Sequence, residues 1–321
     1  MLKRILLFVL GALLFLAACG PTTPAADELT SIRLPMGFIP DPQYAPFYVA
    51  VENGYFAEEG FEVEFDYSFE TDGMALVGAN ELPFALVGGE QVVLARAQGL
   101  PVVYVLEWFQ KYPIAVVSKA DANIQTPADL NGRSVGIPGF FGATYVGYVG
   151  LLSANELTQD DVNASEIGFT QVESLLTDQV EAVVGYGNNE PIQLAGQGED
   201  INVLFVADFI DMVATGLISN EETIAENPEL VEGFTRAILR GLQDTIDDPE
   251  AAFEISKNFV EGLEDERMPV LDASIEMWEA ETLGVTEASS WEQTQQVLID
   301  MGFLDGPVEN LEAAYTNEFV E

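Results

Sequence analysis

Strand patterns and helix patterns alternate along most of the chain, and this alternation limits the fold more than any other feature. Phe61–Tyr67 (FEVEFDY) alternates apolar and polar residues with the period of a strand, and Gly73–Asn80 after it reads as a short helix. Ser31–Phe38 and Ala45–Glu59 form a similar strand–helix pair before them. Because this order favours parallel strands covered by helices, the sequence predicts an α/β fold with a parallel sheet.

The alternation falls into two sets, which are followed by a helical tail. Further strands are expected at Leu82–Val87, Val102–Trp108 and Ile114–Val117, and in the second set at Ser134–Ile137, Glu166–Phe169, Ala182–Tyr186 and Val203–Val206. From Glu221 onward the pattern is helical almost to the end. We therefore expect two lobes, with the tail packed on the first.

The composition excludes several classes of protein. The chain has 54 Asp and Glu against 11 Lys and Arg, and a net charge of −43 repels nucleic acid. It has no histidine and one cysteine, which excludes zinc sites built on these residues, Ser-His-Asp and Cys-His triads, and a disulfide within the chain. With 48% hydrophobic and 10% aromatic residues, a folded core is expected.

The N-terminal segment reads as an export signal. Lys3 and Arg4 precede the apolar run Ile5–Ala18, whose 14 residues fall short of the ~20 that span a bilayer. The run ends in LAACG (16–20), which resembles the lipobox of bacterial lipoproteins. We expect a signal peptide over 1–18, a lipid on Cys19 and a tether over 19–29, and an ordinary secretory signal is the alternative.

Five motifs, in order along the chain, resemble those of substrate-binding proteins of bacterial ABC importers. They are PDPQYAPFYVA (40–50), ENGYF (52–56), LVGGE (86–90), IQTPADLNG (124–132) and YGNNE (186–190). The branch that they resemble is related to thiamine-pyrimidine synthesis and uptake, alongside riboflavin, sulfonate, nitrate and taurine binders. The resemblance implies a two-lobed periplasmic-binding-protein type II fold that closes about a hinge.

The resemblance also implies an organisation and partners. Lobe 1 would comprise 30–117 and 211–321, and lobe 2 would comprise 118–210, with crossovers at Phe109–Ser118 and Phe205–Gly216. The protein would be an extracytoplasmic monomer, anchored to the cell membrane by its lipid. It would deliver a small molecule to the permease and ATPase subunits of an ABC importer.

Binding residues are expected in the turns that follow strands, because ligands of open α/β sheets lie beyond the carboxyl ends of the strands. Gly88 and Gly89 leave bare backbone N–H groups that can approach a ligand, or they simply make a tight turn. Trp108 is expected either in the pocket or in the core. The ligand-binding residues expected in lobe 1 are Phe38, Asp41, Tyr44, Gly88, Gly89 and Trp108.

Two turns of lobe 2 carry candidates of the same kind. Phe140 and Phe141 are neighbours and cannot share one face, so at least one is expected to face a cleft, where a flat ring could stack on it. The turn 186–190 offers a phenol, two amides and a carboxylate, and helix capping explains only part of this set. The ligand-binding residues expected in lobe 2 are Phe141, Thr144, Tyr186, Asn188, Asn189 and Glu190.

The charge balance favours a neutral ligand. The candidate turns contain one basic residue, Lys111, whereas anion binders normally present Arg or Lys. A flat neutral heterocycle fits better, and the number of aromatic residues in the turns favours riboflavin. The alternatives are a thiamine pyrimidine precursor (hydroxymethyl- or formylamino-pyrimidine) and, less well matched, a sulfonate or nitrate anion. No cofactor or metal is expected.

Catalysis and scaffolding are the rival classes of function. Eukaryotic pyrimidine synthases that share the implied fold use a histidine and a cysteine-rich motif, and this chain has neither. Acid–base work by paired carboxylates stays conceivable, but most carboxylates lie on helix faces where solvation explains them. A scaffold lipoprotein would need no ligand and would not explain the aromatic turns. The sequence therefore predicts a binding protein and not an enzyme.

Overall fold

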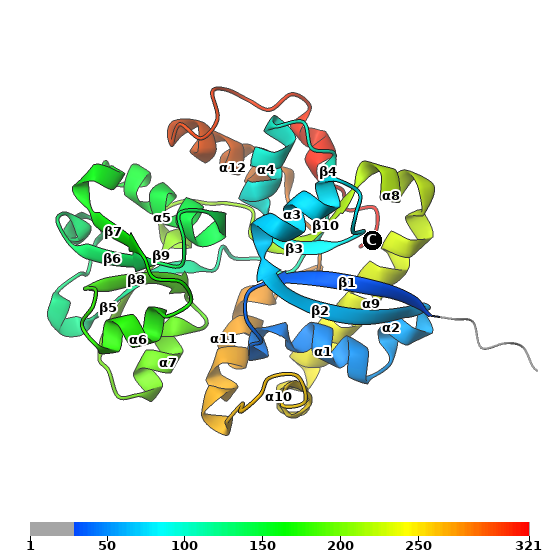
Figure 1. Cartoon of the computed structure of the whole chain (residues 1–321), viewed down its shortest axis with the longest axis horizontal. Coiled ribbons are helices and arrows are strands. Elements are labelled where there is room, and N and C mark those ends of the chain that lie inside the picture. The colour runs from blue at the N-terminus through cyan, green and yellow to red at the C-terminus, as the bar shows by residue number, and fades with distance from the viewer. Residues whose placement is uncertain (1–28, 321) are drawn as a thin grey trace, which may run out of the picture.

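The computed structural model describes residues 29–320, and Figure 1 shows its two lobes side by side. The expected signal peptide, Cys19 and nearly all of the expected tether lie outside the described residues and stay predictions from the sequence. Within residues 29–320, no helix combines the length and the apolar character needed to cross a membrane.

Lobe 2, on the left of Figure 1, is built on one five-stranded sheet in the order β7-β6-β8-β5-β9. Its β6 strand is parallel to β7 and β8, whereas β5 is antiparallel to β8 and β9, so the predicted parallel sheet is only partly correct. The strands are β5 (Ile114–Lys119), β6 (Ser134–Ile137), β7 (Asn163–Glu166), β8 (Ala182–Tyr186) and β9 (Ile201–Phe205), and the helices are α5 (Gly142–Ala154), α6 (Gln171–Leu176) and α7 (Glu190–Gly196).

The strand predicted at Glu166–Phe169 is wrong by three residues. The β7 strand starts at Asn163 and ends at Glu166, where its pairing with β6 ends. Gly168 then takes a φ of 60°, a left-handed conformation that breaks an extended chain. The break leaves Phe169 free to leave the sheet and enter the space between the lobes.

Lobe 1 contains two small sheets. In one, β1 (Thr30–Gly37) runs parallel to β2 (Phe61–Phe69). In the other, β10 (Thr215–Asn220) lies between β3 (Ala85–Gly88) and β4 (Val102–Glu107) and is antiparallel to both. The sequence analysis did not predict β10. Because β10 is antiparallel to both neighbours, this sheet also differs from the predicted parallel arrangement.

Helices surround the sheets of lobe 1, and most of the helical tail lies against them (Figure 1). The helix predicted over Ala45–Glu59 is split, because Gly54 adopts a φ of 77° between its two halves. The helices are α1 (Ala45–Glu52), α2 (Tyr55–Glu58), α3 (Glu70–Gly78), α4 (Gly89–Ala97), α8 (Glu221–Glu226), α9 (Pro228–Asp247), α10 (Pro249–Ser256), α11 (Met268–Trp278) and α12 (Ala288–Asp300).

Short 3-10 helices connect many of these elements. The first of them, η1, follows β1 and leads directly into α1. They are η1 (Pro42–Tyr44), η2 (Ala120–Ala122), η3 (Pro127–Leu130), η4 (Gln159–Asp161), η5 (Val206–Asp208), η6 (Asp265–Arg267) and η7 (Leu311–Ala314).

The two segments that cross between the lobes lie side by side. The backbone N–H groups of Trp108 and Phe109 donate to the carbonyl oxygen of Thr215 at 3.2 and 2.9 Å. The next strand, β5, pairs only with strands of lobe 2, so the first crossover ends before Ile114. The lobe boundary expected at 117/118 therefore lies a few residues earlier.

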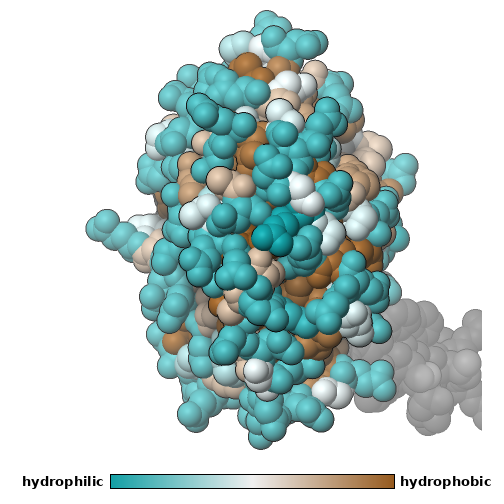
Figure 2. Space-filling view, turned by 90° about the vertical axis from the view of Figure 1, so that its left-hand side faces the viewer, coloured by the Kyte–Doolittle hydropathy of each residue, from teal (hydrophilic) through white to brown (hydrophobic). Residues whose placement is uncertain are grey.

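The outer face of lobe 2 is strongly hydrophilic. Figure 2 shows this face covered mainly by polar residues, with apolar ones scattered between them. Its ion pairs include Lys119–Asp178 at 2.8 Å and Arg133–Glu181 at 2.8 Å. Exposed pairs of this kind contribute little to stability, and the surface acts mainly to solvate the acidic chain.

Candidate ligand-binding site

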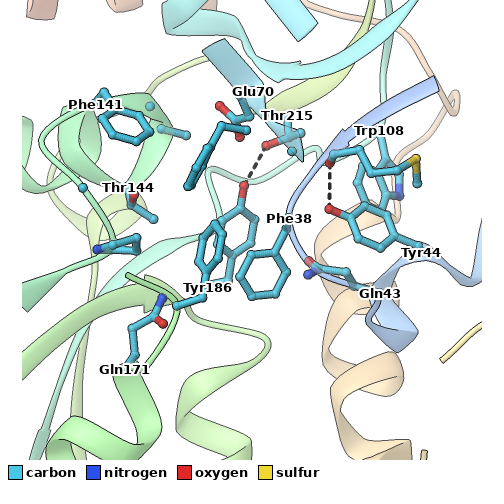
Figure 3. A pocket seen from close by; sticks show the side chains of 18 residues that line it. Phe38, Gln43, Tyr44, Glu70, Trp108, Phe141, Thr144, Gln171, Tyr186 and Thr215 are labelled. Atoms are coloured by element: carbon cyan, nitrogen blue, oxygen red, sulfur yellow. Dashed lines mark hydrogen bonds between the residues drawn. The ribbon is translucent and has the colours of Figure 1, made fainter. Parts of the chain in front are cut away.

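A pocket lies between the two lobes, at the ends of strands from both sheets (Figure 3). It encloses about 660 Å³ of atom-free space with its opening, but only about 50 Å³ admits the centre of a water-sized sphere. It is therefore a narrow slot. Its walls comprise Met36, Gly37, Phe38, Gln43, Tyr44, Phe69, Glu70, Trp108, Pro138, Gly139, Phe141, Gly142, Ala143, Thr144, Phe169, Gln171, Tyr186 and Thr215.

Aromatic rings from opposite lobes meet across the slot. Phe38 of lobe 1 contacts Phe169 of lobe 2 edge to face, with ring centroids 4.8 Å apart. Phe69 of lobe 1 lies 5.3 Å from Phe141 and 5.4 Å from Phe169. Because these pairs join the lobes, the structure has the closed arrangement, and a ligand can enter only when the lobes separate.

The inner end of the slot is built on two stacked rings. Tyr44 stacks on Trp108 with centroids 5.5 Å apart, and its hydroxyl donates to the carbonyl oxygen of Met36 at 2.7 Å (Figure 3). Trp108 is 2% exposed and its indole N–H has no partner among the described residues. Trp108 thus belongs to the core and to the pocket wall at once.

The structure also places Phe141, Thr144 and Tyr186 on the pocket wall. Phe141 is 40% exposed, whereas its neighbour Phe140 turns away from the pocket and packs on Tyr145. The hydroxyl groups of Tyr186 and Thr215 lie 3.3 Å apart and link the lobes (Figure 3). Six of the twelve residues expected from the sequence therefore line the pocket: Phe38, Tyr44, Trp108, Phe141, Thr144 and Tyr186.

Asn188 and Asn189, whose amides were expected to contact the ligand, are buried and make hydrogen bonds between the lobes instead. Asn188 donates to Ser274 of α11 at 2.7 Å and is fully buried. The side-chain oxygen of Asn189 accepts from Gln193 at 2.7 Å and from Arg267 at 3.0 Å. The amides of this turn hold the closed lobes together and do not line the pocket.

Asp41 and Glu190 also lie outside the pocket wall. Asp41 accepts from Arg267 at 2.5 Å and from the Gln43 N–H at 3.1 Å. Burial raises its pKa, and Arg267 opposes this rise. Glu190 accepts from the Tyr186 N–H at 2.7 Å, and burial raises its pKa to about 7. Both carboxylates support turns behind the rings.

Gly88 and Gly89 serve close packing, which corrects the expectation that their N–H groups face a ligand. The N–H of Gly89 donates to the carbonyl of Ala214 at 3.0 Å. A Cβ at Gly89 would lie 2.3 Å from Val213 Cγ1, and one at Gly88 would lie 2.4 Å from the Glu90 carboxyl oxygens. A larger residue at position 89 would therefore clash with Val213, and one at position 88 would displace the carboxyl group of Glu90.

Glu70 is the one carboxylate on the described pocket wall, and the sequence reading missed it. Gln91 donates to it, and Gly37, with a φ of 82°, leaves the space that its side chain fills. Burial raises the pKa of Glu70, and the backbone N–H groups of Gly88 and Ala143 oppose this rise. Glu90 is fully buried beside it, and burial together with the charge of Glu70 raises the pKa of Glu90. The carboxyl oxygens of Glu90 have no hydrogen-bond partner among the described residues, so the nearby charge of Glu70 further disfavours ionisation of Glu90.

Other wall residues were also missed, for different reasons. Thr215 opens the unrecognised strand β10, and Gln43 lies within a motif that was read for its aromatic residues. Phe69 and Phe169 follow strand patterns, so a search of every strand end for aromatic residues would have found them. Gln171 is 4% exposed and lines the pocket, so its amide lies within reach of a ligand.

The pocket wall is uncharged apart from Glu70. The side chains that line it include no Lys or Arg. Between residues 29 and 320, no group of three or more Cys, His, Asp or Glu is placed to hold a metal ion. The site can stack on a flat ring and accept hydrogen bonds at Glu70. Gln171, Tyr186 and Thr215 can each donate or accept a hydrogen bond.

The sequence is similar to a known protein family and to several characterised proteins. The model of a family described as NMT1/THI5 like matches residues 41–252. The riboflavin-binding protein RibY of Chloroflexus aurantiacus is 39% identical, over 99% of this chain and 97% of its own. A formylaminopyrimidine-binding protein of Halalkalibacterium halodurans is 31% identical, over 94% of each chain. A 4-amino-5-hydroxymethyl-2-methylpyrimidine phosphate synthase of Aspergillus parasiticus is 25% identical, over 66% of each chain.

The fold has close counterparts among solved structures. The periplasmic aliphatic sulphonate binding protein SsuA of Escherichia coli superposes with a TM-score of 0.72 at 13% identity, covering 88% of this chain and 91% of that one. At this identity the likeness concerns the fold alone. The two-lobed periplasmic-binding-protein fold predicted from the sequence is confirmed.

Proposed function

The chain belongs to the NMT1/THI5-like family, and on that premise we propose that it is a solute-binding protein for a neutral planar heterocycle, riboflavin first among them. The lobes close on the ligand and release it unchanged to the permease and ATPase subunits of an ABC importer. The full-length similarity to a riboflavin-binding protein supports this choice of ligand.

The observation that carries the proposal is the slot of aromatic rings without a cation. Phe38, Phe69, Phe141 and Phe169 come from both lobes and line the narrow space between them. Rings at such positions stack on a flat ligand or meet its edge, and closure removes both faces of the ligand from water. A tricyclic isoalloxazine uses more of this wall than a single pyrimidine ring does.

Glu70 gives the site a preference for ligands that carry an N–H group. A carboxylate only accepts hydrogen bonds and has about four acceptor positions, so it has room beyond its bond from Gln91. The imide N–H of a flavin is a suitable donor. When Glu70 is ionised, an anion placed at the same point would meet a like charge, which disfavours sulfonate and nitrate.

We assign direct ligand contact to the six expected residues on the pocket wall and support of that wall to the other six. The wall residues are Phe38, Tyr44, Trp108, Phe141, Thr144 and Tyr186, joined by Glu70 and Gln171. The supporting residues are Asp41, Gly88, Gly89, Asn188, Asn189 and Glu190. Substitution of a supporting residue would act through closure of the lobes or through folding.

The proposed place of action is the outer face of the cell membrane. The apolar run Ile5–Ala18 followed by Cys19 supports export and lipid attachment, with the body acting as a monomer. Anchoring would keep the binding protein near its permease. Loss of lipid labelling in a Cys19→Ser variant checks the anchor.

A formylaminopyrimidine or a related thiamine precursor is the second candidate ligand. The 31% identical relative named for that ligand favours it, and an amino group on the pyrimidine would also donate to Glu70. We propose binding without catalysis for either ligand. The chain has no histidine, and the family's synthases are its more distant relatives.

A panel of ligands tests the proposal. The exported form, starting at Cys19, is heated alone and with riboflavin, a formylaminopyrimidine or an alkanesulfonate, and the unfolding temperature is recorded. Because a ligand that binds only the folded state raises this temperature, riboflavin is expected to give the largest shift and the sulfonate none. A shift with the sulfonate alone would contradict the proposal, and chromatography of the recovered riboflavin checks that it is unchanged.

A further inference from the structure

A second cavity adjoins the binding pocket, beyond the rings of Phe38 and Phe169. It admits the centre of a water-sized sphere over about 460 Å³, against about 50 Å³ in the pocket. Phe38, Phe169 and Gln171 line both spaces. The rings of Phe38 and Phe169, one from each lobe, therefore separate the two spaces. When the lobes move apart, these rings part and the spaces connect.

The polar groups of this cavity come from both lobes and are paired with one another. Arg267 Nη2 donates to Asp41 Oδ2 at 2.5 Å and to Asn189 Oδ1 at 3.0 Å. Gln193 Nε2 donates to the same Asn189 oxygen at 2.7 Å. Glu190 adds a carboxylate to this wall. The wall therefore offers donors and acceptors without an excess of positive charge.

This chemistry matches hydroxyl groups better than it matches an anion. A hydroxyl donates one hydrogen bond and accepts others, so it can bond with amides and carboxylates alike. Arg267, the guanidinium on the described wall, lies against the carboxylate of Asp41, and its Nε has no partner among the described residues. The carboxylates of Glu173 and Glu190 would repel a phosphate.

Gln171 stands at the passage between the two spaces. It is the first residue of α6, and Figure 3 shows its side chain on the lobe 2 side of the pocket, below Thr144. Because it lines both spaces, its amide can bond a group that passes Phe38 and Phe169.

A third cavity, on the other side of the pocket, has the wrong chemistry for hydroxyl groups. It admits the centre of a water-sized sphere over about 410 Å³ and is lined by Met74, Leu94, Leu100, Val146 and Phe303 among others. Its wall is mostly apolar and carries few polar side chains (Thr71, Gln91, Gln98 and Tyr145), so most hydroxyl groups of a polyhydroxyl chain placed there would lose their bonds to water without replacement. The polar cavity is the one that suits a hydroxylated chain.

We propose that the polar cavity beyond Phe38 and Phe169 holds a polyhydroxyl side chain of the ligand while the ring system lies in the aromatic slot. For riboflavin this is the ribityl chain. The inference rests on the proposed function and deepens it, because it states that the protein recognises the chain as well as the ring. Gln193 is a specificity-determining residue in this arrangement.

Comparison of riboflavin with lumiflavin, which has a methyl group in place of the ribityl chain, tests the proposal. Wild-type protein is titrated with both, and Gln193→Leu is titrated alongside. Loss of one hydrogen-bonding group is expected to weaken riboflavin binding about 2- to 10-fold and to leave lumiflavin binding unchanged. The matched control is Gln179→Leu, an exposed position of lobe 2 outside the three cavities. Gln193→Asn, which shortens the side chain and keeps its amide, serves if the leucine variant does not fold.

The outcomes separate this inference from the proposed function. Equal affinities of the wild type for riboflavin and lumiflavin would overturn it, and so would an equal loss for both ligands in the Gln193 variants. If the wild type binds neither flavin, the proposed function itself fails and the inference falls with it. A loss confined to riboflavin supports both.

Discussion

At the level of single residues, the neighbours Phe140 and Phe141 differ in their relation to the binding pocket. Both side chains are exposed, at 47% and 40%, yet only Phe141 lines the binding pocket and meets Phe69 across the lobes. Phe140 contacts Tyr145 instead, at 5.7 Å between ring centroids. The two residues therefore form a matched test of ligand stacking.

Phe141→Ala is expected to weaken riboflavin binding about 5- to 30-fold, because loss of a stacked ring costs about 1–2 kcal/mol. Phe140→Ala should leave the affinity unchanged. Since both side chains are exposed, neither change should alter the free energy of unfolding by more than about 0.5 kcal/mol. Titration of each variant with riboflavin checks the prediction, and equal affinities of the two variants would remove Phe141 from the site.

At the level of elements, the contact of α9 with α1 positions the chain that enters the pocket. Gly241 of α9 lies against α1, and a Cβ at this position would stand 2.1 Å from the carbonyl oxygen of Pro46. The residues just before α1 form η1, which carries Gln43 and Tyr44 into the pocket wall. Close helix packing in lobe 1 thus supports the site.

Gly241→Ala is expected to lower the free energy of unfolding by about 1–3 kcal/mol, because the added methyl forces the two helices apart. Gly196→Ala, at the last position of α7, is the control. Nothing lies within 4 Å of its added methyl, so alanine there should be neutral or stabilise by up to about 1 kcal/mol. Urea unfolding measures both, and a neutral Gly241→Ala would contradict the close contact.

Most helices and strands could be predicted from the sequence because their patterns are local. The prediction failed where pairing with distant strands determines whether a segment is a strand and in which direction it runs. The segment Thr215–Asn220 carries no strong strand signal, and it becomes β10 because β3 and β4 flank it. The antiparallel direction of β5 likewise depends on the return of the chain between lobes. Such long-range pairing cannot be read from periodicity.

The same division applies to the site. Rings that directly follow strands, such as Phe38 and Tyr186, were found because strand ends gather at one edge of a sheet. Arg267 approaches Asp41 from 226 residues away, and this contact has no local signal. The side chains of Asn188 and Asn189 were assigned to the ligand, whereas they bond across the lobes. Sequence reasoning located the turns but did not resolve which way their side chains point.

At the level of the whole molecule, folding buries carboxyl groups that ordinarily ionise. Burial raises the pKa of Glu107 and Glu190 to about 7, and it also raises the pKa values of Glu70 and Glu90. In the unfolded chain these groups ionise near the usual value of 4.5. Between pH 4.5 and about 7 the folded state therefore binds more protons than the unfolded state, and folding loses stability as the pH rises.

The urea midpoint is expected to be higher at pH 5 than at pH 8.5. The carboxyl groups of Glu59 and Glu181 have lowered pKa values and act in the opposite sense, but their contribution is lost only below their usual range. Glu190→Gln keeps an oxygen for the Tyr186 N–H and cannot ionise, so it should reduce the difference between the two pH values. A midpoint that rises toward pH 8.5 would contradict the burial of these groups.

The two lobes of the molecule meet through aromatic rings and amides, and we propose that a flavin is held between those rings. Titration of riboflavin with the protein, followed by flavin fluorescence, measures this directly. Stacking against Tyr44, Trp108 and the phenylalanines is expected to quench the emission, with saturation at one flavin per chain and a dissociation constant of about 1 µM or tighter. Emission that stays unchanged, or that falls without saturating, would contradict the account.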